Sequence, residues 1–149
     1  MTLYHIDKWK YRNIWPPEGT LHASGRWNEV GQWMIYCSPS IALAKLEILA
    51  NESFLPIKRV CMTIEVKEQK SLYKVSKDQL SDDWLLKPYP KDLTTYSKKF
   101  LTSGCLIMQV PSAQSQREYN YLINVRHTDF NNQITLKSVI SEPFDPRLK

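Results

Sequence analysis

The hydrophobic residues of this chain occur in short segments separated by turn-forming residues, and this spacing limits the fold more than any other feature of the sequence. The segments have the length of β-strands, and the one at 57–66 alternates between apolar and polar residues, as a half-exposed strand does. We expect strands at 3–6, 33–37, 57–66, 72–75, 105–110, 119–125 and 133–139. The pattern predicts an α+β fold with mostly antiparallel strands.

Two other segments are expected to be helical. Ser38 and Pro39 offer an N-cap and a first-turn proline for a helix at about 39–50, and a second helix is expected at 93–101. The tail at 144–148 is expected to pack back on the sheet. A chain of 149 residues has the size of one domain, so residues 1–149 are interpreted as a single domain.

The charge of the chain points to an anionic partner. The formal net charge is +5, from 20 Lys and Arg against 15 Asp and Glu. This fits a nucleotide, a nucleic acid or an acidic protein. The basic residues are spread along the chain, and the loose lysine cluster at 87–99 is more typical of a solvated face than of a nucleic-acid surface.

Cysteine usage indicates a reducing compartment. Cys37, Cys61 and Cys105 lie in apolar segments without a C-x-x-C spacing, so we expect buried free thiols. The histidines are scattered, and no Cys/His spacing resembles a zinc site. No apolar stretch is long enough for a signal peptide or a membrane span. These features predict a soluble cytoplasmic protein with no metal and no membrane partner.

The helix expected at 39–50 carries two charges that point in nearly opposite directions. At about 100° per residue, Lys45 and Glu47 lie on different sides of a helix that is otherwise apolar. If Lys45 faces solvent, Glu47 faces a core or a cleft and needs a partner or a ligand. If Glu47 faces solvent, the stem of Lys45 covers apolar surface. The periodicity alone leaves both arrangements open.

Common catalytic motifs are absent, including G-x-S-x-G, H-E-x-x-H, the P-loop and G-x-G-x-x-G. The remaining candidates are polar residues placed in apolar or turn-rich segments. They are Arg26, Tyr36, Glu47, Ser112 and Asn120. Each also has an ordinary structural explanation, such as a surface arginine, a core ring, a turn serine or a cross-strand amide.

Two blocks of the sequence resemble the RES-domain toxins. The first block consists of Gly25-Arg26-Trp27-Asn28, Gly31, Ile35-Tyr36-Cys37-Ser38 and Ala42-Leu43-Ala44-Lys45-Leu46-Glu47. The second consists of Val110-Pro111-Ser112-Ala113, Glu118-Tyr119-Asn120-Tyr121-Leu122-Ile123-Asn124 and His127, followed by the similar ending Phe144-Asp145-Pro146-Arg147-Leu148. The blocks stand in the order of the family, and the resemblance spans nearly the whole chain.

The chain also departs from the family pattern at three places. His5 stands where members usually have an arginine in the first strand, and 22–24 replaces a glycine-rich stretch. These two changes affect the substrate contacts expected in that region. Val125-Arg126 stands before His127 where proline is common, which alters only a turn.

The resemblance implies an ADP-ribosyltransferase-like fold, in which two small, mostly antiparallel sheets and a few helices surround a cleft for NAD. It implies that NAD is a substrate and that no true cofactor is needed. The active-site set of the family maps onto Arg26, Tyr36, Glu47 and Ser112, with Asn120 as an addition on the binding side. It also implies that Glu47 faces inward.

The residue types suit cleavage of the nicotinamide–ribose bond. Glu47 would hold the ribose hydroxyls and stabilise an oxocarbenium-like ribose cation. Arg26 has a planar fork of donors for the pyrophosphate or a ribose oxygen. Tyr36 would stack on the charged nicotinamide ring. Ser112 would donate a hydrogen bond to the ribose or the carboxamide.

The function that the resemblance implies is that of the toxin in a toxin–antitoxin pair, which depletes NAD by hydrolysis or phosphorolysis. The partner would be an Xre-like helix-turn-helix antitoxin that blocks the cleft and makes the DNA contacts, so the chain itself would bind no nucleic acid. A homodimer or a larger complex with the antitoxin is left open. The alternatives are a mono-ADP-ribosyltransferase acting on one protein, an RNA-directed toxin favoured only by the basic charge, and a pure interaction module.

Overall fold

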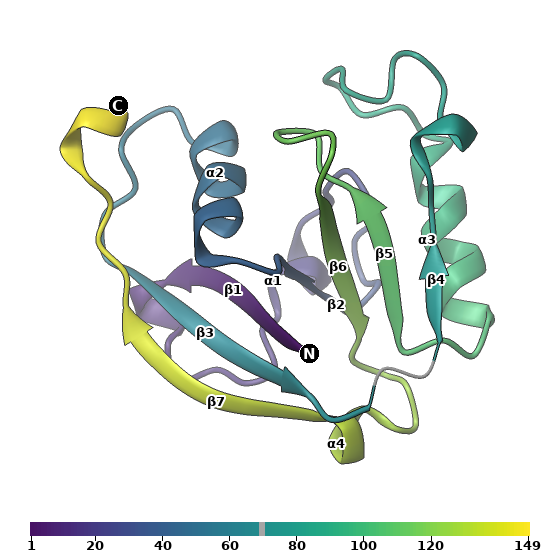
Figure 1. Cartoon of the computed structure of the whole chain (residues 1–149), viewed down its shortest axis with the longest axis horizontal. Helices are drawn as coiled ribbons and strands as arrows, with labels where there is room; N and C mark the ends of the chain where they lie inside the picture. The colour runs from purple at the N-terminus through teal and green to yellow at the C-terminus, as the bar shows by residue number, and fades with distance from the viewer. Residues whose placement is uncertain (69–70) are drawn as a thin grey trace.

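The computed structural model describes residues 1–68 and 71–149, and its strands form two sheets (Figure 1). The first sheet has the order β1-β3-β7, with the bounds Thr2–Lys8, Arg59–Val66 and Ile134–Ser141. The second has the order β2-β6-β5-β4, with the bounds Met34–Cys37, Tyr119–Asn124, Ile107–Pro111 and Leu72–Lys74. Strand pairing is antiparallel except between β4 and β5. The predicted α+β class with mostly antiparallel strands is confirmed.

The two long helices lie close to their predicted positions. They are α2 at Ile41–Asn51 and α3 at Leu93–Thr102, and the shorter elements are α1 (Gly19–His22), α4 (Phe130–Gln133), η1 (Trp9–Tyr11), η2 (Lys77–Gln79) and η3 (Pro146–Leu148). The start predicted for the first long helix is wrong by two residues. Ser40 is the N-cap of α2, and its hydroxyl accepts the Leu43 N–H at 3.1 Å. Ser38 has a different partner, described below.

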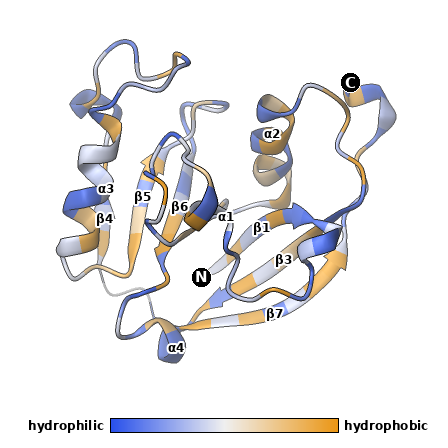
Figure 2. Ribbon diagram, turned by 180° about the vertical axis from the view of Figure 1, so that it is seen from behind, coloured by the Kyte–Doolittle hydropathy of each residue, from blue (hydrophilic) through white to orange (hydrophobic). Residues whose placement is uncertain are grey.

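The helices cover the outer faces of the two sheets, and the largest core lies between the sheets. Leu3, Met62 and Ile64 of the first sheet meet Ile35 and Ile123 of the second sheet in this core. The helix α3 packs on the second sheet through Leu93 and Phe100, which lie in one cluster with Met108 and Leu122. The second sheet is therefore buried on both faces, and Figure 2 shows hydrophobic residues concentrated along its strands.

The helix α2 and the C-terminal tail cover the outer face of the first sheet. Ala44 of α2 lies in one buried cluster with Ile6, Cys61 and Phe144. The predicted packing of the tail on the sheet is thus confirmed. The prediction that 57–66 is a half-exposed strand is wrong in its first half, because the strand begins at Arg59 and Val60, Cys61 and Met62 are buried in succession. The expected alternation holds from residue 63 to residue 66. The strand β3 is central in its sheet and is covered on both faces, which its alternating sequence does not reveal.

The two sheets are joined where β1 passes the end of β2. The backbone N–H groups of Tyr4 and Ser38 each donate to the carbonyl of the other residue, at 2.9 Å. All three cysteines are free thiols, but Cys105 is partly exposed, so its predicted burial is wrong. Within the described parts of the chain, no helix has the length and apolar character that a membrane span requires.

Candidate active site

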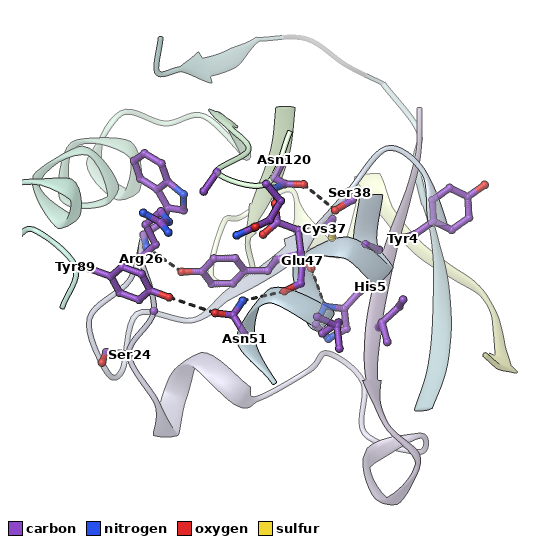
Figure 3. A pocket seen from close by; sticks show the side chains of 18 of the residues that line it. Tyr4, His5, Ser24, Arg26, Cys37, Ser38, Glu47, Asn51, Tyr89 and Asn120 are labelled. Carbon is purple, nitrogen blue, oxygen red and sulfur yellow. Dashed lines mark hydrogen bonds between the residues drawn. The ribbon is translucent and has the colours of Figure 1, made fainter. Parts of the chain in front are cut away.

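A cavity of about 490 Å³ opens where the two sheets meet, and four of the five sequence-predicted site residues line it. Arg26, Tyr36, Glu47 and Asn120 face this space from a loop, from β2, from α2 and from β6 (Figure 3). They are far apart in the sequence: Tyr36 and Asn120 come from neighbouring strands of the second sheet, and Glu47 comes from the helix that packs on the first sheet. The fifth residue, Ser112, lies behind Glu47 and does not line the cavity.

The carboxylate of Glu47 is held by two donors on the same oxygen. Its Oε1 accepts the Ser112 hydroxyl at 2.6 Å and the Asn120 amide at 2.7 Å. Within residues 1–68 and 71–149 no hydrogen bond to its Oε2 is present. One oxygen therefore anchors the carboxylate, and the other is left for a ligand.

The donor direction of Ser112 is enforced by its surroundings. Its side chain is fully buried, and its Oγ accepts the backbone N–H groups of Gln114 and Ser115, both at 3.1 Å. Because both lone pairs are then used, the single hydroxyl proton is directed at Glu47. This geometry favours a positioning role for Ser112 over the direct ligand contact suggested by the resemblance.

The amide of Asn120 is oriented in a similar way by Ser38. The Ser38 hydroxyl donates to Asn120 Oδ1 at 2.7 Å, which turns the amide nitrogen toward Glu47. Ser38 is itself buried. It was not singled out from the sequence as a site residue, although it lies in the segment that resembles the family. The position of Ser38 in that segment could have marked it as a site residue, but its role becomes clear only from its contact with Asn120.

The expectation that Glu47 faces inward is confirmed, because Glu47 lines the cavity, whereas Lys45 is only partly exposed and does not mark the solvent face of α2. Lys45 donates to the carbonyl of Pro143 at 2.9 Å and lies 3.9 Å from Glu142, so it holds the C-terminal tail. The exposed stripe consists of Ala42, Leu46 and Ala50. Glu47 can face the cavity because the outer side of the helix carries small or apolar residues.

Tyr36 shapes the loop that carries Arg26. Its hydroxyl accepts the Trp27 N–H at 3.1 Å and donates to Asn28 Oδ1 at 2.7 Å. Burial raises the pKa of Tyr36 well above its usual range, so the phenol is neutral at physiological pH. A Cβ on Gly25 would lie 2.9 Å from both the Tyr36 hydroxyl and Asn28 Oδ1, so the loop requires glycine at this position. The hydroxyl of Tyr36 is thus used by the loop, while its ring faces the cavity.

Arg26 lies between two aromatic rings at the mouth of the cavity. Its guanidinium carbon is 4.6 Å from the centre of the Tyr89 ring and 5.5 Å from that of Trp84, and it donates to the Trp84 carbonyl. Burial lowers the pKa of Arg26, and the nearby Tyr89 and Glu47 partly offset this effect. The guanidinium remains charged, since arginine is not deprotonated in proteins. A cation and a carboxylate therefore line one cleft.

Other lining residues were not among the predicted site residues, although His5 stands at one of the positions where the chain departs from the family pattern. His5 Nδ1 lies 2.7 Å from the Tyr36 carbonyl, and its Nε2 lies 3.4 Å from Asp7. Asn51 Oδ1 accepts Lys87 Nζ at 3.1 Å and the Tyr89 hydroxyl at 3.4 Å (Figure 3 shows the latter contact). No local signal marks Asn51 or Tyr89, because their contact joins α2 to a distant loop.

The donor set favours an organic anion over a metal ion. In the described residues, no group of three His, Cys, Asp or Glu side chains is placed to hold a metal. The cavity instead combines the guanidinium of Arg26, the aromatic rings of Tyr36 and Tyr89, and the anchored carboxylate of Glu47. Such a set can bind phosphate at one end and stabilise a positive charge at the other.

Comparison with known proteins identifies a family and a fold. The model of the RES domain matches residues 2–145. A protein named Toxin Res from Yersinia enterocolitica serotype O:8 / biotype 1B is 31% identical over 153 residues, covering 100% of both chains. A protein named Prs ADP-ribosylating toxin from Sphingobium sp. (strain YBL2) is 31% identical over 135 residues, covering 87% of this chain and 83% of its own.

A solved structure shows the same fold. It is the crystal structure of the M. tuberculosis MbcT-MbcA toxin-antitoxin complex, one chain of which superposes with a TM-score of 0.77. The superposition covers 99% of this chain and 85% of that chain, at 18% sequence identity. The fold is thus shared at low sequence identity.

Proposed function

The chain belongs to the RES domain family, and from this premise we propose that it is the toxin of a toxin–antitoxin pair and cleaves the nicotinamide–ribose bond of NAD. The observation that carries this proposal is the carboxylate of Glu47, anchored through Oε1 by Ser112 and Asn120 and facing the cavity that Arg26 also lines. NAD is the substrate, and no cofactor takes part in the proposed reaction.

The proposed reaction breaks the bond between the ribose C1 atom and the nicotinamide nitrogen. The bonding electrons leave with nicotinamide, which becomes neutral, and the positive charge passes to the ribose ring. Glu47 Oε2 accepts a hydrogen bond from the ribose hydroxyls and stabilises this cation electrostatically. An acceptor oxygen then bonds to C1. Water as acceptor gives ADP-ribose and a proton.

The other cavity residues bind and orient the substrate. Arg26 pairs with the diphosphate through its planar donors, and the ring of Tyr36 faces the positively charged nicotinamide. Ser112 and Asn120 keep the Glu47 carboxylate in one orientation, so that it does not have to reorganise during the reaction.

The molecule that accepts ADP-ribose distinguishes NAD depletion, the leading function, from protein modification, its alternative. We propose water or phosphate as the acceptor, which makes the chain an NAD glycohydrolase or phosphorylase. Transfer of ADP-ribose to a protein is the second candidate. It is favoured by the relative from Sphingobium, whose name describes an ADP-ribosylating toxin.

We further propose that an antitoxin covers the cleft. Support comes from the structural neighbour, which is described as a toxin-antitoxin complex, and from the net charge of +5, which suits an acidic partner. In the proposal, the antitoxin is an Xre-like helix-turn-helix protein that makes the DNA contacts. The toxin would act in the cytoplasm, where NAD is present.

Nicotinamide release from NAD by the purified protein tests the proposal. Chromatography with and without phosphate separates ADP-ribose from its phosphorylated form, and NAD labelled in the adenosine part reveals transfer to protein. Arg26→Ala should abolish release, and Arg147→Ala is the matched control because the Arg147 side chain is 90% exposed and bonds to Asp145. Label on protein alone would favour the transferase, and no cleavage with either acceptor would reject the proposed function.

A further inference from the structure

A second cavity adjoins the first at the mouth of the cleft. It has a volume of about 690 Å³ and shares the lining residues Ser24, Gly25, Arg26, Lys87 and Tyr89 with the first cavity. Its outer wall is formed by the start of α3 and the loop before it, including Lys91, Thr94, Thr95 and Lys98. The two cavities together form one elongated groove, with Glu47 in the first cavity.

Positive charge increases along this groove, away from Glu47. Among the residues that line the first cavity, the Lys and Arg side chains are those of Arg26 and Lys87, and both also line the second. The opposite end of the first cavity is lined by Tyr4, His5 and Ile6. Farther out, the second cavity carries Lys91 and Lys98, and its carboxylate, Glu29, is paired with Lys98 at 3.2 Å.

Lys87 and Arg26 lie around the same aromatic ring. The Lys87 Nζ atom is 5.4 Å from the centre of the Tyr89 ring, and the Arg26 guanidinium carbon is 4.6 Å from it. Asn51 holds Lys87 in place by accepting its ammonium at 3.1 Å. The amide of Asn51 is oriented in turn, because its Nδ2 donates to the Glu47 carbonyl at 2.9 Å. Lys87 is therefore tied to the helix that carries the carboxylate.

We propose that Lys87 is a second diphosphate-binding residue and that the second cavity receives the adenosine end of the dinucleotide. This inference rests on the proposed function. With the nicotinamide ribose at Glu47, a diphosphate with two negative charges lies between Arg26 and Lys87. The diphosphate then lies at residues that both cavities share, so the adenosine beyond it extends into the second cavity, toward α3.

The test compares Lys87→Met with the unchanged protein. Methionine keeps most of the apolar stem and removes the charge. We expect the KM for NAD to rise about tenfold, as for loss of a charge-assisted hydrogen bond, while kcat stays within about twofold. Calorimetry with ADP-ribose, which is not consumed, should show a similar weakening of Kd. Lys87→Arg should restore most of the affinity.

Lys99→Met is the matched control. Lys99 is exposed and is not among the residues that line either cavity, so its replacement makes the same change in net charge without touching the groove. Both its KM and its Kd should stay within about twofold of the unchanged protein.

Three outcomes separate the inference from the function on which it rests. If the unchanged protein cleaves NAD and Lys87→Met leaves KM and Kd unaltered, the role of Lys87 is overturned while the function stands. If ADP-ribose binds and Lys87→Met weakens it but no NAD is cleaved, the diphosphate site stands and the reaction fails. If neither binding nor cleavage occurs, both are overturned.

Discussion

The hydroxyl of Ser38 donates to Oδ1 of Asn120 at 2.7 Å and thereby determines which end of that amide faces the cleft. The amide nitrogen then donates to Glu47, whose Oε1 also accepts the proton of Ser112. The chain of contacts runs from the end of β2 through β6 to α2, so the second sheet orients the carboxylate that α2 carries.

Replacing Ser38 with alanine should lower kcat for NAD cleavage by about three- to tenfold with little change in KM. The lost hydrogen bond is worth roughly 1 kcal/mol, and its loss leaves the Asn120 amide free to turn. Steady-state nicotinamide release measures the effect. Ser40→Ala is the control, because it removes the N-cap of α2 and should cost about 1 kcal/mol of stability without a change in kcat. An equal fall in kcat for both variants would contradict the positioning role.

Glu47→Gln should reduce nicotinamide release by at least about 100-fold, because an amide cannot stabilise the ribose cation as a carboxylate does. The fold should be retained, since Glu47 lies at the cavity and an amide oxygen can still accept from Ser112 and Asn120. Thermal unfolding of the variant checks the fold independently of activity. A Glu47→Gln variant with full activity would remove the carboxylate from the proposed mechanism.

Gly25→Ala should lower the free energy of unfolding by about 1–3 kcal/mol, because the added Cβ meets the Tyr36 hydroxyl and Asn28 Oδ1 at 2.9 Å. The loop must shift to relieve this contact, and Arg26 shifts with it, so the KM for NAD should also rise. Gly19→Ala is the matched control, since its Cβ would meet nothing within 4 Å. Urea titration should place the control within about 0.5 kcal/mol of the unchanged protein.

Tyr36→Phe should reduce the loss of folding stability at alkaline pH, because it removes the contribution of the Tyr36 phenol to that loss. Burial raises the pKa of Tyr36 above its ordinary value of 10.0, so above this pH the unfolded chain loses the proton while the folded chain retains it. The folded state then binds more protons, and stability falls as pH rises above about 10. Below that pH the contribution is constant.

The comparison of unfolding midpoints at pH 8 and at pH 10.5 or above, for both proteins, measures this effect. The unchanged protein should lose more stability over that interval than Tyr36→Phe. At pH 8 the variant should be less stable by about 1–2 kcal/mol, because Trp27 and Asn28 lose their partner. Parallel losses on alkalinisation would show that Tyr36 titrates at its ordinary value.

Much of the fold could be predicted because the signals are local. A strand such as Ile107–Pro111 is marked by a short apolar run, and the helix α2 by a run of good helix-forming residues. The burial of both faces of β3 could not be predicted from a local signal. Whether its second face is covered depends on α2 and the C-terminal tail, which are distant in the sequence.

The candidate site also combines residues that could be predicted from the sequence with residues that only the tertiary structure reveals. Residue type and pattern made Arg26, Tyr36, Glu47, Ser112 and Asn120 candidates, and the resemblance to the RES domain made them the expected site. The structure places four of them at one cavity, with Ser112 behind Glu47. Sequence reasoning did not identify three further residues of the site, Ser38, Asn51 and Lys87. Their importance follows from hydrogen bonds between distant segments, Ser38 with Asn120 and Asn51 with Lys87.

The sequence by itself determined most of the secondary structure and the residue types of the site. Backbone conformation depends largely on neighbouring residues, and side-chain chemistry depends on the residue itself. The tertiary structure decided the direction in which Glu47 and Lys45 point, the donor that each hydrogen bond uses, and the meeting of the two cavities at Arg26. These depend on how the two sheets join at Tyr4 and Ser38, a contact between strands more than 30 residues apart that no local pattern encodes.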